Sequence, residues 1–370
     1  MKKIFKTSLF LFIALFLGII GGVGAYFVLN KNSVARYMAS VMDNNRTHDF
    51  VIKKADTLKL FQAKSDVASS LALGSVHLRV PGSKKIGEFI PFKNIQSETQ
   101  LSKADFLREI KSSLSENETK RLILWVHGFN TSSEKAVITF GEFIDDLHLE
   151  AVPLLFLWNS GNSALSYKNA LNSTSSAGDS LSELLTFINQ EVKPQEIIII
   201  AYSMGGKVLC NALDTLYKNP SWSDEDKEIS HVILIAPNVD KDDFDSSFKE
   251  QLLAMVKNLT VYVSSHDNML LLSKLLYKID SLGLPKQFPP NTQIDEVASL
   301  LSLMKQGSKE ITIVDVSYIK LNSISGHLYY KNREVVSDLH WLMKTGLPAK
   351  QRFLYPHPGG HNLNYWILPP

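Results

Sequence analysis

Cysteine is nearly absent from this sequence: among 370 residues the only thiol belongs to Cys210. A chain with one thiol cannot form an internal disulfide, and it offers little to a zinc site built from Cys and His. Cys210 falls inside a segment with helical periodicity. We therefore interpret it as a small apolar core residue, and not as a nucleophile.

An excess of one charge is missing as well. Lys and Arg number 39 against 37 Asp and Glu, which gives a formal net charge of +2. No basic stretch is interleaved with aromatic residues, so nucleic acid is not an expected partner. Internal repeats and low-complexity tracts are also lacking, and the length suits one large α/β domain or two small ones after an N-terminal segment.

Charge is absent from residues 7–29, directly after the basic start formed by Lys2, Lys3 and Lys6. An apolar run of this length is what a helix needs to cross roughly 30 Å of hydrocarbon. We predict a signal anchor over residues 1–30, which places the remaining chain outside the cytoplasm on the periplasmic side. The alternative is a cleaved signal peptide with secretion, because Val23-Gly24-Ala25 is a suitable cleavage site.

The rest of the chain divides into three parts. We expect a polar spacer over residues 31–73, one domain over residues 74–346, and a tail over residues 347–370, rich in Pro and aromatics, that lies along the domain surface. A long segment over residues 269–309 is interpreted as part of a lid. Apolar runs predict strands at 75–80, 86–92, 121–126, 152–157, 197–200, 231–235, 259–263 and 311–316. Helical periodicity predicts helices at 102–114, 133–147, 177–188, 206–213 and 334–343. This alternation predicts a mostly parallel central sheet with helices on both faces.

The most informative stretch is residues 196–213. An unbroken apolar strand leads into a short turn and then a helix, and the turn reads Ala201-Tyr202-Ser203-Met204-Gly205. A serine at a sharp strand-to-helix turn, with small residues two before and two after, is the pattern of a nucleophile elbow. Ala201 stands where Gly is usual, and a buried serine in an ordinary turn is the competing interpretation.

A serine nucleophile needs a base, and the base needs an acid that fixes its tautomer. The expected chain order is serine, acid, histidine. Asp267 is the favoured acid because it follows the strand 259–263 closely. Asp240 is its competitor, followed by Asp242 and Asp243.

His327 is the favoured base, since it follows the last strand in Ser325-Gly326-His327 and precedes the closing helix. The other histidines are less suitable by position: His266 adjoins the acid, His340 lies in the closing helix, and His357 and His361 lie in the tail.

Two backbone N–H groups are needed to hold an oxyanion. Met204 N–H is expected to supply the first. The second is expected from Phe129, with Asn130 as the fallback, in the loop His127-Gly128-Phe129-Asn130 that follows a predicted strand. His127 precedes the serine in sequence, so we interpret it as a hydrogen-bonding group that fixes this loop.

With these motifs in place, the sequence resembles the α/β-hydrolase superfamily, and within it a bacterial group of unknown function. The resemblance covers about residues 74–343 and is carried by VHGFN at 126–130, AYSMG at 201–205, FLWNSG at 156–161 with Tyr167 after it, APNVD at 236–240, and YVSSHD at 262–267. It implies Ser203, Asp267 and His327 as a catalytic triad. Asn238 departs from the Asp that the resemblance leads us to expect.

The sequence therefore predicts a serine hydrolase that cleaves an ester or another acyl bond of a small-molecule or lipid substrate. It implies neither metal nor cofactor, and it leaves the oligomeric state open. The rival interpretations are a membrane-tethered domain that binds without turnover and an acyltransferase with the same triad.

Overall fold

The computed structural model describes residues 45–54, 72–81, 86–87, 95–161, 163–219, 222, 229–285, 311–321, 323, 325–357 and 364–370. Thr47–Val80 and Lys85–Pro370 belong to one compact unit. The predicted anchor over residues 1–30 and most of the predicted lid lie outside the described residues. Of the helices that are described, none is long and apolar enough to cross a membrane.

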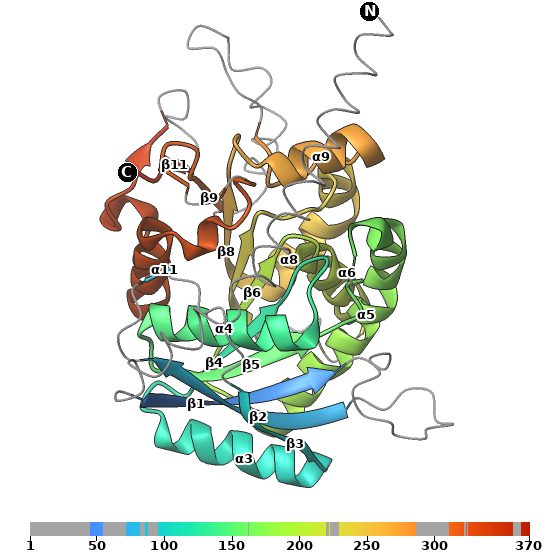
Figure 1. Cartoon of the computed structure of the whole chain (residues 1–370), viewed down its shortest axis with the longest axis vertical. Helices are drawn as coiled ribbons and strands as arrows, with labels where there is room; N and C mark the ends of the chain where they lie inside the picture. The colour runs from blue at the N-terminus through green and yellow to red at the C-terminus, as the bar shows by residue number, and fades with distance from the viewer. Residues whose placement is uncertain are drawn as a thin grey trace, which may run out of the picture. The chain divides into compact units, whose positions relative to one another are not determined.

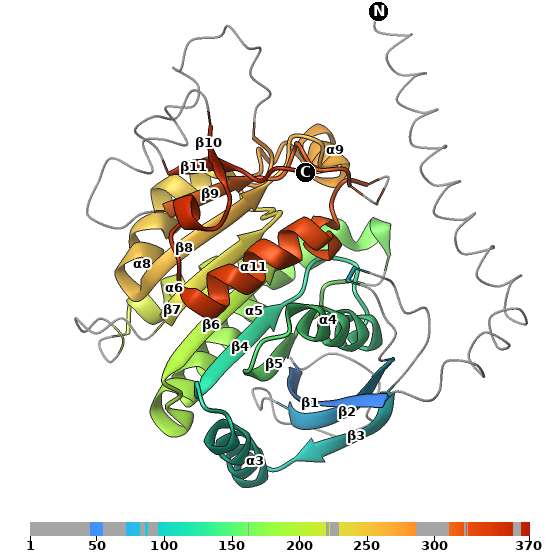
Figure 2. The same ribbon diagram turned by 90° about the vertical axis from the view of Figure 1, so that its left-hand side faces the viewer.

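The centre of this unit is an 11-stranded sheet in the order β10-β11-β9-β8-β7-β6-β4-β5-β1-β2-β3 (Figures 1 and 2). Its strands are β1 (Asn45–Lys54), β2 (Ala72–Pro81), β3 (Ile95–Leu101), β4 (Arg121–Val126), β5 (Val152–Leu157), β6 (Glu196–Tyr202), β7 (Ile229–Ile235), β8 (Val256–Val263), β9 (Ile311–Asp315), β10 (Tyr355–Pro356) and β11 (Tyr365–Ile367). From β1 through β5, β4, β6, β7, β8 and β9 to β11 each neighbouring pair is parallel. Antiparallel pairs occur at both edges, β2 with β3 and β10 with β11. The prediction of a mostly parallel sheet is confirmed.

Helices cover both faces of the sheet, as Figure 2 shows from the side. They are α3 (Lys103–Glu116), α4 (Ser133–Leu147), α5 (Tyr167–Phe187), α6 (Gly205–Tyr217), α7 (Lys241–Asp243), α8 (Lys249–Met255), α9 (Asn268–Tyr277) and α11 (Arg333–Thr345). One apolar cluster joins the sheet to α3, α5, α6 and α8, and a second joins it to α4 and α11. Parallel strands buried on both faces need this double covering.

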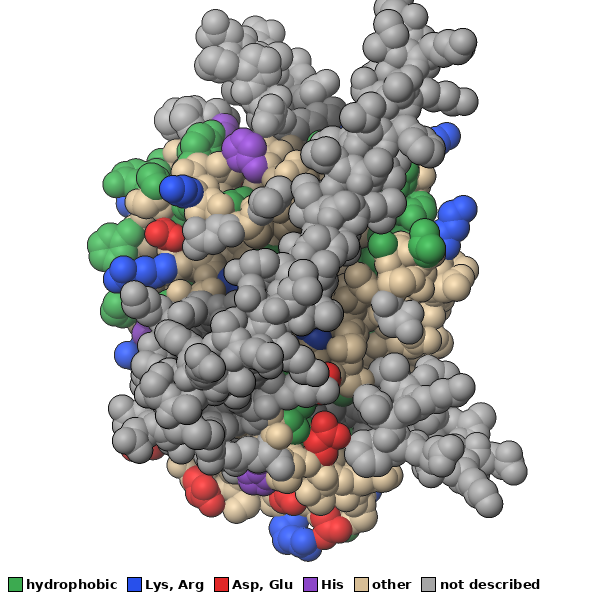
Figure 3. Space-filling view, viewed as in Figure 1, with side chains coloured by type: hydrophobic (Ala, Val, Ile, Leu, Met, Phe, Trp, Pro, Cys, Tyr) green, Lys and Arg blue, Asp and Glu red, His purple; other side chains and the backbone are tan. Residues whose placement is uncertain are grey.

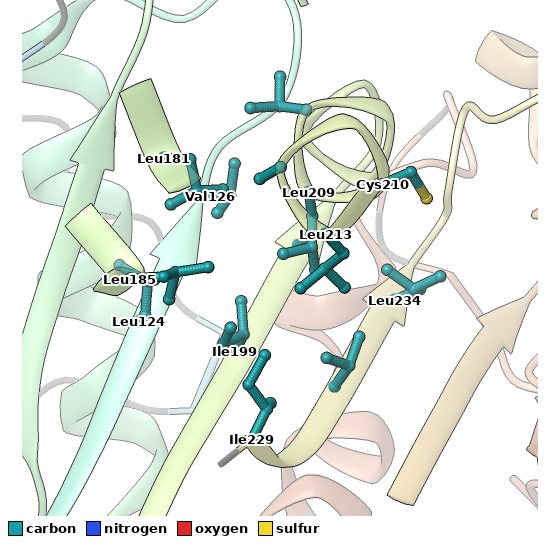
Figure 4. Packing of buried hydrophobic residues seen from close by; sticks show 14 of the residues in the cluster. Leu124, Val126, Leu181, Leu185, Ile199, Leu209, Cys210, Leu213, Ile229 and Leu234 are labelled. Carbon is teal, nitrogen blue, oxygen red and sulfur yellow. The ribbon is translucent and has the colours of Figure 1, made fainter. Parts of the chain in front are cut away.

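Along each central strand, successive side chains point alternately into one apolar cluster and then into the other. In β4, Leu122 and Leu124 enter the cluster with α5 and α6, whereas Ile123 and Trp125 enter the cluster with α4 and α11. Figure 4 shows the first cluster, where Leu124 and its neighbours on β4, β6 and β7 meet side chains of α5 and α6. Cys210 lies in this cluster, and burial raises the pKa of its thiol to about 12. It is the buried apolar residue that the sequence led us to expect.

The N-terminal part of the sheet corrects two predictions. The spacer predicted over residues 31–73 contains β1, which pairs in parallel with β5, so the sheet begins before residue 74. Of the strand predicted over residues 86–92, Ile86 and Gly87 form a turn and residues 88–92 lie outside the described residues, whereas the strand β3 at Ile95–Leu101 was not predicted. Both strands are rich in polar residues, which hid their periodicity.

The C-terminal tail also differs from its prediction. Instead of lying along the surface, it adds β11 to the edge of the sheet in parallel with β9. Tyr365 and Leu368 are buried, and Tyr365 Oη donates a hydrogen bond to Asp315 Oδ2 over 2.8 Å. The prediction of a surface tail is wrong for these residues.

Candidate active site

Ser203 lies at the carboxyl end of β6, on a strained turn before α6. Its φ is +55°, a left-handed conformation that is uncommon for a residue with a side chain. The turn is held because Ser203 N–H donates to Ile235 O over 2.9 Å and Asn238 N–H donates to Ser203 O over 3.0 Å. A Cβ at Gly205 would overlap with the carbonyl oxygens of Val126 and His127, which explains the glycine at this position.

The structure brings the three predicted site residues together from the ends of three strands. Ser203 follows β6, Asp267 follows β8 and His327 follows β9. His327 Nε2 is 2.9 Å from Ser203 Oγ, and His327 Nδ1 is 2.7 Å from Asp267 Oδ2. Because a carboxylate only accepts, Nδ1 carries the proton and the Nε2 lone pair faces the serine hydroxyl. This is the arrangement that general-base activation of a serine requires.

Asp267 has a second task in the fold, because it caps the N-terminus of α9. Its Oδ1 accepts hydrogen bonds from the N–H groups of Met269 and Leu270, at 3.1 and 3.0 Å. Asp267 is buried, with 1% of the residue exposed. Two helix N–H groups thus hold one oxygen and leave the other oxygen to His327.

The loop that carries His327 passes close behind Asp267. Gly326 has φ +62°, and a Cβ there would overlap with the carbonyl oxygen of His266. Any other residue at position 326 would push the two loops apart. Gly326 therefore allows His327 to reach Asp267.

The competing acids have other roles. Asp240 caps the short helix α7 by accepting from the N–H groups of Asp242 and Asp243, and its Oδ2 accepts from Asp280 N–H over 3.0 Å. Asp242 and Asp243 are exposed.

The other histidines lie elsewhere. His340 Nδ1 lies 2.6 Å from Leu147 O on the α4 side of the sheet. His266 Nδ1 contacts Ser317 O at 3.0 Å, and His357 N–H donates to Tyr365 O between β10 and β11. His361 lies outside the described residues.

The loop 127–130 lies against the serine, where an oxyanion would form. A Cβ on Gly128 would be only 2.8 Å from Ser203 Cβ, so glycine permits this approach. Asn130 N–H, the fallback donor, already donates to Ser160 O over 2.9 Å. Among the described residues, the N–H groups of Phe129 and Met204 have no hydrogen-bond acceptor. Both groups are thus able to bind a ligand oxygen.

His127 fixes this loop as expected. Burial lowers its pKa to about 4, so the ring is neutral at pH 7. Nδ1 lies 3.0 Å from Gly128 O and Nε2 accepts from Trp158 N–H over 3.2 Å, which defines the Nδ1–H tautomer. The Trp158 indole N–H donates to His127 O over 2.8 Å.

The segment after β5 completes a clamp on the loop, a role that the sequence did not reveal. Ser160 Oγ accepts from Thr131 N–H at 3.2 Å and donates to Thr131 O at 3.1 Å. Together with the Asn130–Ser160 bond, these contacts hold Asn130 in a left-handed conformation with φ +55°. The FLWNSG motif therefore supports the loop that carries Phe129.

A buried polar network beside the site was missed as well. Asn238 Nδ2 donates to Tyr167 Oη over 2.7 Å, and its Oδ1 accepts from Ser281 Oγ over 2.9 Å. The Tyr167 ring stacks on Tyr277 of α9 at 4.1 Å and meets Phe129 edge-on at 5.2 Å. Asn238, which stands where the resemblance led us to expect Asp, thus links the turn at Ser203 to α9 through Tyr167.

A further neighbour is Tyr202, whose ring lies 5.0 Å from that of His327. Burial, assisted by the hydroxyl of Tyr330 and the carboxylate of Asp267, raises the Tyr202 pKa well above its usual value, so the phenol stays neutral. Across the described part of the chain, no three His, Cys, Asp or Glu side chains gather as a set of metal ligands.

The parallel sheet, the serine turn after its central strand and the late histidine loop define the α/β-hydrolase fold. The sequence matches the family described as "Alpha/beta hydrolase of unknown function (DUF900)" over residues 102–344, and the chain belongs to this family.

Among solved structures, the chain is similar to an esterase from Pyrococcus furiosus, with 13% identity, a TM-score of 0.35, and coverage of 76% of this chain and 85% of the esterase. It is also similar to a lipase-esterase related protein from Clostridium acetobutylicum, with 15% identity, a TM-score of 0.32, and coverage of 62% and 96%. No curated protein matches the sequence significantly.

Proposed function

We propose that this protein is a serine hydrolase that cleaves an ester or another acyl bond through an acyl-enzyme. The observation that carries the proposal is the continuous chain of hydrogen bonds from Asp267 through His327 to Ser203, at 2.7 and 2.9 Å. Ser203 lies beside the backbone N–H groups of Phe129 and Met204, which have no hydrogen-bond acceptor among the described residues.

The proposed reaction has two halves. Ser203 Oγ attacks the acyl carbon while His327 Nε2 takes the hydroxyl proton, and the carbonyl electrons move to the oxygen. The N–H groups of Phe129 and Met204 hold this oxyanion. As the intermediate collapses, the bond to the leaving group breaks and that group receives the proton from Nε2. A water molecule then attacks the acyl-enzyme, with His327 again as base, and the acid product leaves Ser203 free.

Asp267 keeps the imidazole in one tautomer throughout and stabilises its protonated form. The aromatic and apolar side chains beside the site, including Phe129 and Tyr167, would suit an acyl chain. The proposed substrate is therefore a small-molecule or lipid ester.

A fluorophosphonate probe tests the proposal because it reacts only with an activated serine. Labelling is expected for the wild type and not for Ser203→Ala or His327→Ala, since loss of either group costs on the order of 10⁶-fold in a well-studied serine hydrolase. The control is Ser113→Ala, a change on the exposed side of α3 that leaves labelling intact. A folded wild type that is not labelled would exclude catalysis and favour a binding domain.

We also propose that residues 1–30 anchor the chain in a membrane with the hydrolase domain outside the cytoplasm. Support comes from the uncharged run 7–29 behind three lysines. Protease added to spheroplasts should digest the domain and leave cytoplasmic markers intact. Protection of the domain would reverse the proposed orientation, and its appearance in the medium would indicate signal cleavage.

A further inference from the structure

The outer surface of α9 is apolar where a helix of a water-soluble domain is normally polar. Leu271, Leu275 and Leu276 are 44%, 59% and 45% exposed, whereas Leu270 and Ser273 on the inner side are buried. We call the three exposed residues the α9 leucine face. Figure 1 draws α9 near the top of the domain, and Figure 3 shows hydrophobic side chains along the right-hand side of the same view.

This face borders the candidate active site. α9 begins at Asp267, and Leu328, which follows His327 directly, is 40% exposed. Leu165 in the short helix Ala164–Ser166 is 95% exposed and lies two residues before Tyr167, which stacks on Tyr277 of α9. Exposed leucines thus occur beside three elements that build the site. Exposed apolar side chains gathered on one helix face, as on α9, mark an interaction surface.

The charge on α9 is of one sign. Residues 268–278 contain Lys274 and Lys278 and no acidic residue. Lys274 Nζ pairs with Asp280 Oδ1 at 2.9 Å, outside the helix, and its side chain is 42% exposed. An apolar helical face flanked by lysines matches the interface of an anionic bilayer, where leucines enter the acyl boundary and cations meet the headgroups.

We propose that the α9 leucine face rests on the surface of an anionic lipid bilayer and turns the serine site toward lipid. The length of the chain before β1 favours this occupant. Between the uncharged run 7–29 and Asn45, where β1 begins, there are 15 residues, 30–44, and 15 residues span at most about 50 Å. The inference rests on the proposed anchor. It gives the proposed hydrolase a substrate class, namely esters held in a membrane.

The experiment places a fluorophore on the face. Cys210 is buried and its thiol pKa is about 12, so it does not compete for a thiol-reactive label. Full-length Leu275→Cys carries an environment-sensitive nitrobenzoxadiazole dye in vesicles of phosphatidylethanolamine and phosphatidylglycerol. Ser113→Cys on the exposed side of α3 is the matched control. Flotation of the vesicles shows that both variants are membrane-bound.

A blue-shifted emission at position 275, quenched several-fold more by doxyl-labelled lipid than at position 113, is the expected result. Weaker quenching in pure phosphatidylcholine is expected from the lysines. Water-like emission at 275 in floated vesicles overturns the proposal. A blue shift without lipid quenching also overturns it, because another protein surface then covers the face. None of these readouts needs turnover, so they are independent of the labelling test on Ser203.

Activity gives a second readout if Ser203 is reactive. Leu271→Ser with Leu275→Ser should lower hydrolysis of a vesicle-borne ester several-fold, with fluorophosphonate labelling of Ser203 in solution unchanged. If ester hydrolysis and fluorophosphonate labelling fell equally, the two leucines would be needed for the structure of the site and not for contact with lipid.

Discussion

Gly326 and Gly346 have the same backbone conformation in opposite surroundings. Their φ angles are +62° and +63°, but a Cβ at Gly326 would overlap with His266 O, whereas nothing lies within 4 Å of one at Gly346. The left-handed conformation alone costs a residue with a side chain roughly 1–2 kcal/mol. Comparing substitutions at Gly326 and Gly346 therefore distinguishes the cost of backbone strain, which both share, from the displacement of His327, which only a substitution at Gly326 causes.

We expect Gly326→Ala to slow fluorophosphonate labelling by about 10²-fold, the loss that a 1 Å misplacement of a reacting group can cause. Gly346→Ala should lower the free energy of unfolding by roughly 1–2 kcal/mol and leave labelling unchanged. Labelling rates and urea unfolding curves measure both effects. Equal labelling rates in the two variants would contradict the role assigned to Gly326.

Two buried histidines make stability depend on pH. Burial lowers the pKa of His127 to about 4, and burial together with the charge of Arg352 lowers that of His231 to about 3. The unfolded chain takes up these protons near pH 6.5, before the folded protein does. Stability is therefore full above pH 6.5, and it falls as the pH decreases toward the folded values.

Between pH 7 and pH 5, each of these histidines should remove about 2 kcal/mol from the free energy of unfolding. His231→Gln is the better probe because it lies away from the serine, with Nε2 2.9 Å from Thr260 Oγ1. Urea unfolding at both pH values should show a smaller loss for the variant than for the wild type. An unchanged loss would mean that His231 is already protonated in the fold.

At the scale of residues, the sequence predicted the three side chains that the structure brings together, and it missed the residues that support them. Ser203, Asp267 and His327 stand at strand ends in a recognisable order, so each could be proposed from its local context. Asn238 and Tyr167 are 71 positions apart, and their hydrogen bond depends on how α5 packs beside the loop after β7, which no local pattern encodes.

At the scale of elements, the loop 127–130 depends on the segment after β5. Ser160→Ala removes both hydrogen bonds of Ser160 Oγ with Thr131 and keeps the backbone bond to Asn130. A looser Phe129 N–H should stabilise the oxyanion less, and the labelling rate should fall by about tenfold, part of the 10²–10³-fold that complete removal of a donor costs.

Ser102→Ala is the control for that variant, because Ser102 caps α3 by accepting from Asp105 N–H over 3.1 Å. It should cost about 1 kcal/mol of stability and leave labelling unchanged. If both serine variants react like the wild type, the clamp does not position Phe129.

Elements with clear periodicity were predicted well, and polar ones were not. The helix predicted over 133–147 and the strand over 152–157 coincide with α4 and β5. α5 begins at Tyr167, ten residues before its prediction, because its first turns contain many Ser and Asn and few apolar residues. β1 and β3 were missed for the same reason.

At the scale of the whole domain, the tail is held by a buried ion pair. Arg352 Nη1 lies 2.8 Å from Asp338 Oδ1 of α11, with both side chains 1% exposed, and Tyr262 Oη donates to Asp338 Oδ2 over 2.6 Å. Burial raises the pKa of Asp338, against the opposing effect of Arg352. The tail could not be placed from the sequence because its partners lie on β9 and α11.

Arg352→Met should destabilise the protein by about 3–5 kcal/mol, since it leaves the buried Asp338 carboxylate with the Tyr262 hydroxyl but without its positively charged partner. Adding Asp338→Asn should recover part of this loss. Lys218→Met breaks an exposed pair with Asp214 and serves as the control, with no measurable effect expected. Urea unfolding curves measure these effects. If the double variant loses as much free energy of unfolding as Arg352→Met and Asp338→Asn lose together, the two side chains are not energetically coupled.

The double use of Asp267 has a consequence for its amide replacement. Asn has one acceptor oxygen and one NH2 group, so it cannot serve both α9 and His327 as a carboxylate does. The two N–H groups of α9 would claim the oxygen and turn the NH2 group toward the imidazole. Nδ1 would then have to accept, the ring proton would move to Nε2, and the lone pair facing the serine would be lost.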